Sequence, residues 1–292
     1  MNLNSILGYT LYKLSLLRKN PLNHVLSLYF HNPNPQIFER IIKWCIEREY
    51  EFIELSTLLD IIKGENQSNK KYVYISFDDG WKGNLDLIPI IEKYNIPITI
   101  FVPILPLQDG NFWWEYVSKK YTSNTFKTIQ TFKTYPETKF RTIIEGIKKE
   151  ISIERSAMTL EQLKDISAHP LINIQCHSYS HPILTNLSDQ SLDYELKGSK
   201  EFLENILSKE INAFSYPNGS LTEREVNRTK QYYTCAFSTI QGYPKAGDDL
   251  YMIKRISLTN NYWSNLAKIT GGWFLITKLK MKFIKLIIKK NK

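Results

Sequence analysis

Two clusters of polar residues in this sequence have the types and spacing to do metal-assisted chemistry. The first is the adjacent pair Asp78 and Asp79, followed by Gly80. Two neighbouring carboxylates repel each other and lose hydration on burial, so the pair indicates a bound cation or a role in proton transfer. Asp and Gly are also common turn formers, so an ordinary turn is the alternative interpretation of this cluster taken alone.

The second cluster is the pair His177 and His181. Histidines four residues apart can present both imidazoles on one side of a tight turn, where their neutral nitrogens bind a divalent metal. A lone histidine is more often structural, but the chain has five histidines and two of them lie at this spacing. With one aspartate they would form a three-ligand set that leaves positions open for water and substrate, while the neighbouring aspartate takes a proton from water.

Both clusters directly follow predicted strands, at residues 72–77 and 171–176. Strand patterns alternate with helical ones along most of the chain, which indicates repeated βα units and a parallel sheet. So many units favour a barrel, and barrel enzymes place catalytic residues at the carboxyl ends of their strands. Further strands are predicted at 24–31, 51–55, 96–102, 211–216 and 235–239, and helices at 37–48, 56–64, 85–95, 160–168, 191–209 and 223–233.

Residues from about 105 to 156 interrupt this alternation with a polar stretch rich in lysine and threonine. They predict an insertion of helical or irregular structure. Trp113 and Trp114 lie within it, and their flat rings could stack on the apolar face of a sugar. They could equally form the core of the inserted element, and the sequence leaves both interpretations open.

The two clusters together resemble a known family. SFDDG at 76–80 resembles the TFDDG motif of the NodB-homology polysaccharide deacetylases, and HSYSH at 177–181 resembles their H-S/T-x-x-H motif. FSYPNG at 214–219 looks like the third motif of the family, at the substrate groove. VLSLYFH near the start and KRISL at 254–258 resemble a subgroup found among cell-surface sugar biosynthesis genes. The resemblance spans roughly residues 23 to 260 and implies a distorted (β/α) barrel of the NodB-homology type.

Carried over residue by residue, the resemblance implies that Asp78 is the general base. It implies that Asp79, His177 and His181 bind a divalent metal, which we expect to be zinc. Water made acidic by the metal would lose a proton to the base and attack an acetamide carbonyl. Ser178 would hold the turn between the histidines by hydrogen bonding.

In the third motif, the resemblance implies that Tyr216, Pro217 and Asn218 contact the substrate, with a backbone N–H near Asn218 facing the oxyanion. Many family members have an arginine in this motif that orients the base, but this chain has Ser215 at the equivalent place. Arg255 could supply the charge from another strand. The alternative is that Arg255 is an ordinary surface residue.

Many members also have a late histidine that acts as general acid, and no histidine follows His181 in this chain. The proton for the leaving amine would then come from Asp78, from water or from a group that the sequence does not identify. His31 could approach the site from a neighbouring strand, although a structural role is the favoured interpretation of this residue.

The composition limits the other functions that the chain could have. The net charge is +9, but residues 254–292 contain ten Lys or Arg and no Asp or Glu, so the first 253 residues sum to −1. A basic nucleic-acid-binding domain is therefore not expected. Three cysteines without metal-binding spacing predict reduced, buried thiols. The start of the chain lacks the features of a signal peptide and no apolar run is long enough to span a bilayer, so we expect a cytoplasmic protein.

The last residues, 271–292, predict a basic amphipathic helix on a membrane surface, where it would bring the site to a lipid-linked sugar. Apolar residues fall on one face of this helix and lysines on the opposite face. The alternative is that the apolar face packs on the barrel as a closing helix. The stretch 11–19 is a weaker second candidate for membrane contact.

These observations predict three parts: an amphipathic extension (1–22), a catalytic domain (23–262) and a basic amphipathic helix (263–292). The expected function is metal-dependent removal of an N-acetyl group from a sugar of a cell-surface polysaccharide or its lipid-linked precursor. The expected location is the cytoplasm or the inner face of the cell membrane. Two alternatives stay open: a deformylase or amidase acting on a lipid-linked aminosugar, and a degenerate sugar-binding module without catalysis.

Overall fold

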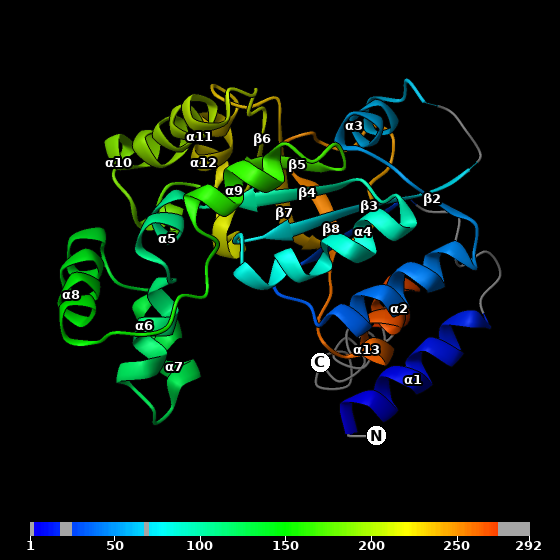
Figure 1. Ribbon diagram of the computed structural model, residues 1–292, viewed down its shortest axis with the longest axis horizontal. Coiled ribbons are helices and arrows are strands. Elements are labelled where there is room, and N and C mark those ends of the chain that lie inside the picture. Colours follow the sequence, from blue (N-terminus) through cyan, green and yellow to red (C-terminus); the bar gives the residue numbers. More distant parts are fainter. Residues whose placement is uncertain (1–2, 18–24, 67–69, 274–292) are drawn as a thin grey trace, which may run out of the picture.

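The computed structural model describes residues 3–17, 25–66 and 70–273. Seven parallel strands close into a barrel that is surrounded by helices (Figure 1). Strand β1 pairs with both β3 and β8, which closes the ring, and β2 is an additional strand outside the ring. The predicted barrel is thereby confirmed. The strands are β1 (Leu26–Phe30), β2 (Tyr50–Phe52), β3 (Lys71–Asp78), β4 (Ile98–Val102), β5 (Ile172–Cys176), β6 (Ala213–Ser215), β7 (Cys235–Gln241) and β8 (Ile253–Ser257).

Most connections between strands are helical. Within the described part of the chain, no helix is both long enough and apolar enough to cross a membrane. The α-helices are α1 (Leu3–Leu16), α2 (Pro35–Ile46), α3 (Leu55–Lys63), α4 (Ile88–Tyr94), α5 (Ile104–Asp109), α6 (Trp113–Lys120), α7 (Thr125–Phe132), α8 (Glu137–Glu150), α9 (Leu160–Ser167), α10 (Asp189–Asp193), α11 (Ser199–Leu207), α12 (Glu223–Thr229) and α13 (Tyr262–Ile269). Short 3-10 turns lie at Lys82–Leu87, Leu184–Asn186 and Pro217–Gly219, and a π-helical turn lies at Tyr194–Gly198.

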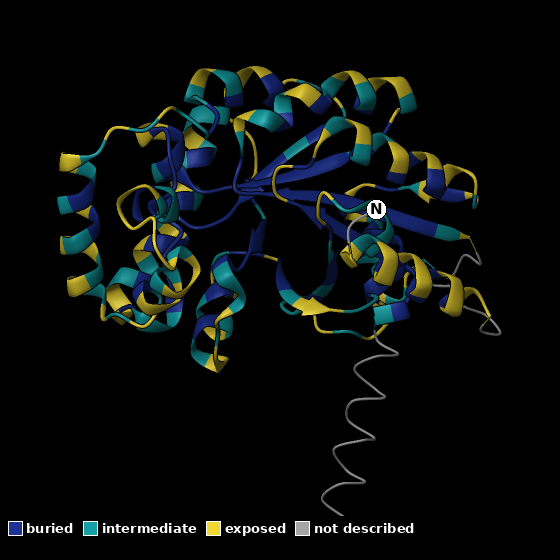
Figure 2. Ribbon diagram, turned by 90° about the horizontal axis from the view of Figure 1, so that it is seen from below, coloured by how far each residue is buried: buried dark blue, intermediate teal, exposed yellow. Residues whose placement is uncertain are grey.

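The strands are buried along nearly their whole length, whereas the helices expose their outer faces (Figure 2). Alternate strand residues point into the barrel and out toward the helices. Inside, Tyr74 of β3 stacks on Phe237 of β7, with ring centroids 5.4 Å apart. The next inward positions on β3 are Ser76 and Asp78, both buried. The barrel interior therefore changes from aromatic to polar toward the carboxyl ends of the strands.

The predicted insertion is helical and lies between β4 and β5. Helices α6, α7 and α8 form a layer beside the barrel, at the left of Figure 1. They have a small hydrophobic core of their own, so the insertion is a packed structural unit. Its buried residues are Trp113, Tyr116, Val117, Phe132, Ile144 and Ile147.

The two ends of the described chain pack together, because α1 lies along α13. Leu11 and Tyr12 are buried in this contact. A Cβ atom on Gly8 would lie 2.6 Å from the backbone nitrogen of Ser264, so only glycine permits this approach. The predicted N-terminal extension thus includes a helix that docks on the protein.

The C-terminal helix predicted over 263–292 starts with α13, but Gly271 adopts a left-handed conformation (φ 75°) just after that helix. Residues 274–292, which include most of the predicted membrane-surface helix, lie outside the described residues. The helix predicted over 191–209 is confirmed as one helical run, 189–207, in which a π-helical turn lies between α10 and α11. That turn carries a residue of the site described next.

Candidate active site

Asp79, His177 and His181 meet where β3 and β5 end. Their candidate ligand atoms lie within 4.8 Å of one another, and all three residues are buried. Asp79 Oδ1 lies 3.4 Å from His177 Nε2 and 3.3 Å from His181 Nε2. It receives no hydrogen bond of acceptable geometry from any described residue, and an unsatisfied buried oxygen is costly. One carboxylate oxygen and two imidazole nitrogens therefore fit a divalent cation.

The residues of this cluster occupy unusual backbone conformations. Asp79, Ser178 and His181 have φ angles of 78°, 71° and 54°, a left-handed region that costs on the order of 1 kcal/mol or more per residue. Ser178 Oγ accepts the N–H of His181 at 3.1 Å, which holds the turn between the histidines. Next to Asp79, a Cβ on Gly80 would lie 2.9 Å from Val102 Cγ1, so the turn requires glycine.

A hydrogen bond orients the His177 imidazole for a metal, although burial lowers its pKa less than the neighbouring aspartates raise it. His177 Nδ1 lies 2.7 Å from the Ser215 carbonyl oxygen, so the proton on Nδ1 is donated there and Nε2 is left for the metal. Burial lowers the pKa of His181, and Asp79 offsets this only in part, so that imidazole is neutral at pH 7. Burial raises the pKa of Asp79, but the attraction of the two neighbouring histidines outweighs it and holds the pKa well below its ordinary value.

Asp78 is held by Arg255, which reaches it from β8 inside the barrel. Nη1 lies 2.8 Å from Asp78 Oδ1, and Nη2 lies 2.9 Å from Oδ2. Ser215 Oγ accepts a hydrogen bond from Nη2 at 2.8 Å and donates to Asp78 Oδ2 at 3.3 Å. Burial raises the pKa of Asp78, but the guanidinium outweighs it and the pKa falls below its ordinary value. Arg255 is completely buried, so it is not a surface residue.

The loop between the histidines is fixed by Glu195, a buried residue of the π-helical turn. Glu195 Oε2 accepts the N–H groups of Tyr179 and Ser180, each at 2.8 Å. Glu195 Oε1 accepts the Ser180 hydroxyl at 2.5 Å and lies 3.8 Å from Arg141 of α8. One carboxylate thus satisfies three donors of the loop that carries the histidines.

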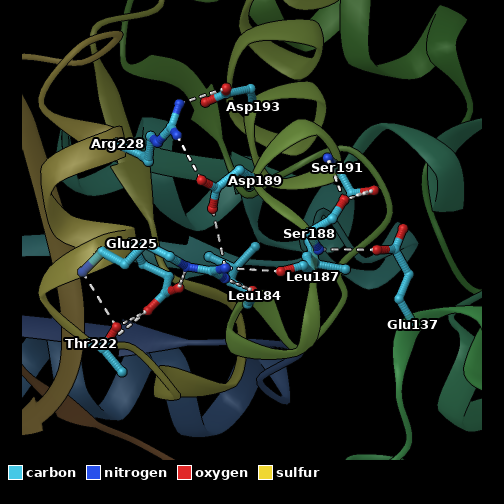
Figure 3. A network of polar contacts seen from close by, with 11 residues as sticks. Glu137, Leu184, Leu187, Ser188, Asp189, Ser191, Asp193, Thr222, Glu225 and Arg228 are labelled. Atoms are coloured by element: carbon cyan, nitrogen blue, oxygen red, sulfur yellow. Dashed lines mark hydrogen bonds and ion pairs between the residues drawn. The ribbon is translucent and has the colours of Figure 1, made fainter.

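The segment that leads from the histidine loop to Glu195 is anchored on two sides (Figure 3). Arg228 of α12 forms ion pairs with Asp189 and Asp193, at 3.0 and 2.8 Å. The N–H of Ser188 donates to Glu137 of α8 at 3.3 Å. These contacts connect the segment both to the barrel helices and to the insertion.

Asp78, Asp79, His177 and His181 line a cavity of about 390 Å³ at the carboxyl ends of the strands. A larger cavity, of about 550 Å³, lies at the other end of the barrel, and none of the metal-binding candidates lines it. The smaller cavity is therefore the candidate substrate site. Its lining includes Tyr29, His31, Asp78, Asp79, Trp81, Trp113, Trp114, Phe126, Ile129, Gln130, Lys133, His177, His181, Tyr216, Asn218 and Thr239.

The structure gives different positions to the two tryptophans of the insertion. Trp113 is 5% exposed, packs in the core of the insertion and donates its indole N–H to the His181 carbonyl at 3.1 Å. Trp114 is partly exposed, stacks on Phe112 and meets the edge of His181 at a centroid distance of 4.7 Å. Trp113 therefore supports the histidine loop, and Trp114 is the one that offers a face to a ligand.

The three residues of the third motif also differ in whether they reach the cavity. Tyr216 and Asn218 line the cavity, whereas Pro217 is buried and does not. Asn218 has a left-handed backbone (φ 58°), and its Nδ2 has no hydrogen-bond partner among the described residues. A buried amide group without a partner, beside a cavity, is available to a bound ligand.

Two residues beyond those predicted from the sequence join the site. His31, for which a structural role is favoured from the sequence, is exposed at the cavity wall and lies near enough to Asp78 and Asp79 to lower their pKa values. Trp81 donates its indole N–H to Asp79 Oδ2 at 3.0 Å. Sequence reasoning does not single out Trp81, although its place directly after the Asp-Asp-Gly cluster was the available signal.

Comparison with known proteins agrees with this geometry. The family model described as "Polysaccharide deacetylase" matches residues 65–234, more than half of the chain. Among curated proteins, the chain is similar to the "Putative polysaccharide deacetylase YxkH" of Bacillus subtilis, at 22% identity over 76% of this chain and 64% of that protein. It is similar to a "Poly-beta-1,6-N-acetyl-D-glucosamine N-deacetylase" of Staphylococcus aureus, at 23% identity over 81% of this chain and 71% of that one.

Among solved structures, the fold is similar to that of the Streptococcus pyogenes deacetylase PplD in complex with acetate. The TM-score is 0.61 at 19% identity, and the match covers 85% of this chain and 98% of that one. The family match includes the aspartate pair and both histidines, and it leaves His31 and Arg255 outside. The chain belongs to the polysaccharide deacetylase family.

Proposed function

We propose that this protein is a metal-dependent hydrolase that removes the acetyl group from an N-acetylated amino sugar. One observation carries the proposal: the Asp79–His177–His181 group lines the same cavity as Asp78, which Arg255 holds from behind. Membership of the polysaccharide deacetylase family supports it. The aligned part spans 64% of the Bacillus relative, so the activity of that whole protein comes to this chain as a proposal.

Asp79, His177 and His181 would hold the metal, and zinc suits two neutral imidazoles with one carboxylate. When bound, the ion supplies a Lewis acid that polarises the amide carbonyl and makes water more acidic. Asp78 is the general base and takes a proton from the attacking water. Its lowered pKa keeps it ionised at neutral pH, and Arg255 fixes the direction of its oxygens. The backbone N–H near Asn218 is the proposed partner of the oxyanion.

Collapse of the tetrahedral intermediate requires a proton on the leaving amine. His31 is the proposed donor, because it lines the cavity close to both aspartates and its position at the end of β1 lies next to β3 in the barrel. In this assignment, His31, which directly follows β1, takes the role of the general-acid histidine that other family members have near the end of the chain. It leaves Asp78 free to act as base alone.

The aromatic lining of the cavity supports a sugar substrate, since partly exposed rings such as Trp114 suit the apolar face of a pyranose. The Staphylococcus relative is named for poly-β-1,6-N-acetyl-D-glucosamine. By analogy, we propose a sugar of a cell-surface polysaccharide, or its lipid-linked precursor, as the substrate. Contact of residues 271–292 with the inner face of the cell membrane stays a prediction.

The test is acetate release from β-1,6-linked N-acetylglucosamine oligomers by metal-free protein, with and without added zinc. We expect one acetate and one free amine for each amide bond that is cleaved, and we expect both only when zinc is present. Formate release from an N-formyl analogue, without acetate release from the N-acetyl sugar, would establish the deformylase alternative. Binding of the oligomers with no product in either assay would establish the sugar-binding module.

A further inference from the structure

Exposed hydrophobic side chains are concentrated on one helix. Of the twelve large hydrophobic side chains that are exposed in the described part of the chain, seven lie between residues 3 and 17. A soluble surface carries such residues singly, and a contiguous group marks a contact with a partner or a membrane. The seven are Leu3, Ile6, Leu7, Tyr9, Leu14, Leu16 and Leu17.

Five of these residues lie on one face of α1, counting Leu17, which directly follows it. Successive helical residues turn by about 100°, which places Leu3, Ile6, Leu7, Leu14 and Leu17 within an arc of about 100°. Their exposed fractions are 81%, 51%, 40%, 48% and 81%. The helix already buries another face, with Leu11 and Tyr12, against the protein. The α1 stripe, meaning these five residues, is therefore a second apolar face that no residue of the described ranges covers.

The charges on the N-terminal segment and on the neighbouring helix α13 indicate what binds the α1 stripe. Residues 1–38 contain three Lys or Arg and no Asp or Glu. Helix α13, against which α1 packs, adds Lys268 and no acidic residue. A second copy of the chain would bring the same positive charge against this face. An apolar stripe on a helix whose own segment carries cations and no acidic residue instead complements an anionic lipid surface.

Hydrogen bonds tie the start of this helix to the loop beside the cavity. Asn261 Nδ2 donates to Ser5 Oγ at 2.9 Å, and the neighbouring Asn260 Oδ1 accepts the N–H of Asn34 at 2.7 Å. Asn34 lies three residues after His31, which lines the cavity. We propose that the α1 stripe binds an anionic lipid surface and holds the rim of the cavity beside it. This binding is independent of the reaction proposed for the site.

The experiment is co-sedimentation of the full-length protein with vesicles of phosphatidylglycerol and phosphatidylcholine, with pure phosphatidylcholine vesicles for comparison. The test variant is Ile6→Gln with Leu14→Gln. The matched control is Ile46→Gln with Ile240→Gln, because these residues are exposed to similar extents, 44% and 49%, outside the stripe. We expect the partition coefficient on anionic vesicles to fall about tenfold or more in the test variant, and to stay unchanged in the control.

A second variant, Leu3→Gln with Leu17→Gln, changes two residues that are each 81% exposed. These substitutions should leave the stability of the fold unchanged. The second variant should show the same loss, and both losses should be larger on anionic than on neutral vesicles. Wild-type binding by both stripe variants overturns the proposal, and so does an equal loss in the control. A concentration-dependent dimer that the stripe variants abolish, with no vesicle binding by the wild type, also overturns it. Acetate release from soluble oligomers tests the reaction separately.

Discussion

Arg255 and Asp78 are 177 residues apart in the chain, yet they form a two-pronged ion pair inside the barrel. The guanidinium also lies 4.0 Å above the ring of Tyr29, so a third strand helps to hold it. Ser215 occupies the place where the resemblance implied an arginine, and it hydrogen-bonds both partners. The charge that orients the aspartate is thus supplied by the last described strand.

Arg255→Lys should keep a positive charge but lose the two-pronged geometry. We expect kcat to fall about 10–100-fold through misplacement of the base, with KM little changed. Arg255 lowers the pKa of Asp78, so weaker pairing should raise that pKa and move the acid limb of the pH profile to higher pH. The pH dependence of kcat measures both effects. An unchanged acid limb would show that Arg255 does not control the base.

Asp78→Asn should keep the metal and lose turnover, because Asp78 is outside the proposed ligand set. A loss of about 10²–10⁴-fold, or more, is typical of removing a general base. Metal content and acetate release are measured on the same preparation. Near-normal turnover would place the base elsewhere.

His177→Ala should lose stoichiometric metal, since it removes one of the two imidazole ligands. His169→Ala is the matched control, because His169 contacts Glu92 at 3.2 Å and does not line the cavity. Metal analysis of the purified proteins distinguishes them. Full metal content in His177→Ala would refute the ligand assignment.

His31→Gln should retain metal and lose turnover, by about 10²-fold or more if it removes the general acid. A substrate with an activated leaving group, which needs no proton, should restore the rate of the variant. Failure of such rescue would indicate a structural role for His31.

Glu195→Ala should weaken metal binding although Glu195 touches no metal ligand directly. It leaves two buried N–H groups without an acceptor, at about 1–3 kcal/mol each, and frees the loop that carries the histidines. We expect zinc affinity to fall about 10–100-fold. Glu195→Gln keeps one acceptor oxygen for the two N–H groups and should recover much of the affinity. Equal zinc binding by Glu195→Ala and the wild type would contradict this role.

Much of this architecture could be predicted from the sequence, because buried parallel strands are nearly continuous apolar runs and alternate with amphipathic helices. The strands predicted at 72–77 and 171–176 match β3 and β5 to within one residue at every end. The proximity of the aspartates and histidines followed from their shared position after strands. These features depend on local pattern, which a sequence records directly.

Other features depend on contacts between distant segments. Trp113 and Trp114 have the same side chain and both line the cavity, but only the packing of the insertion buries Trp113 under the His181 carbonyl and leaves Trp114 partly exposed. His31 reaches the cavity because β1 pairs with β3 and not with β2. This pairing closes the barrel and joins segments that are distant in the sequence. The π-helical turn that positions Glu195 lies inside a segment whose periodicity predicts an uninterrupted helix.

The order of the strands has a consequence for synthesis of the protein. Strand β8 inserts between β1 and β7 and is the last of the eight to leave the ribosome. Until it emerges, β1 and β7 present open edges that can pair with other chains. Asp78 also has no guanidinium beside it during this time, and a hydrated carboxylate resists burial. The nascent chain therefore acquires its closed sheet and its oriented base in a single late step, when Arg255 arrives.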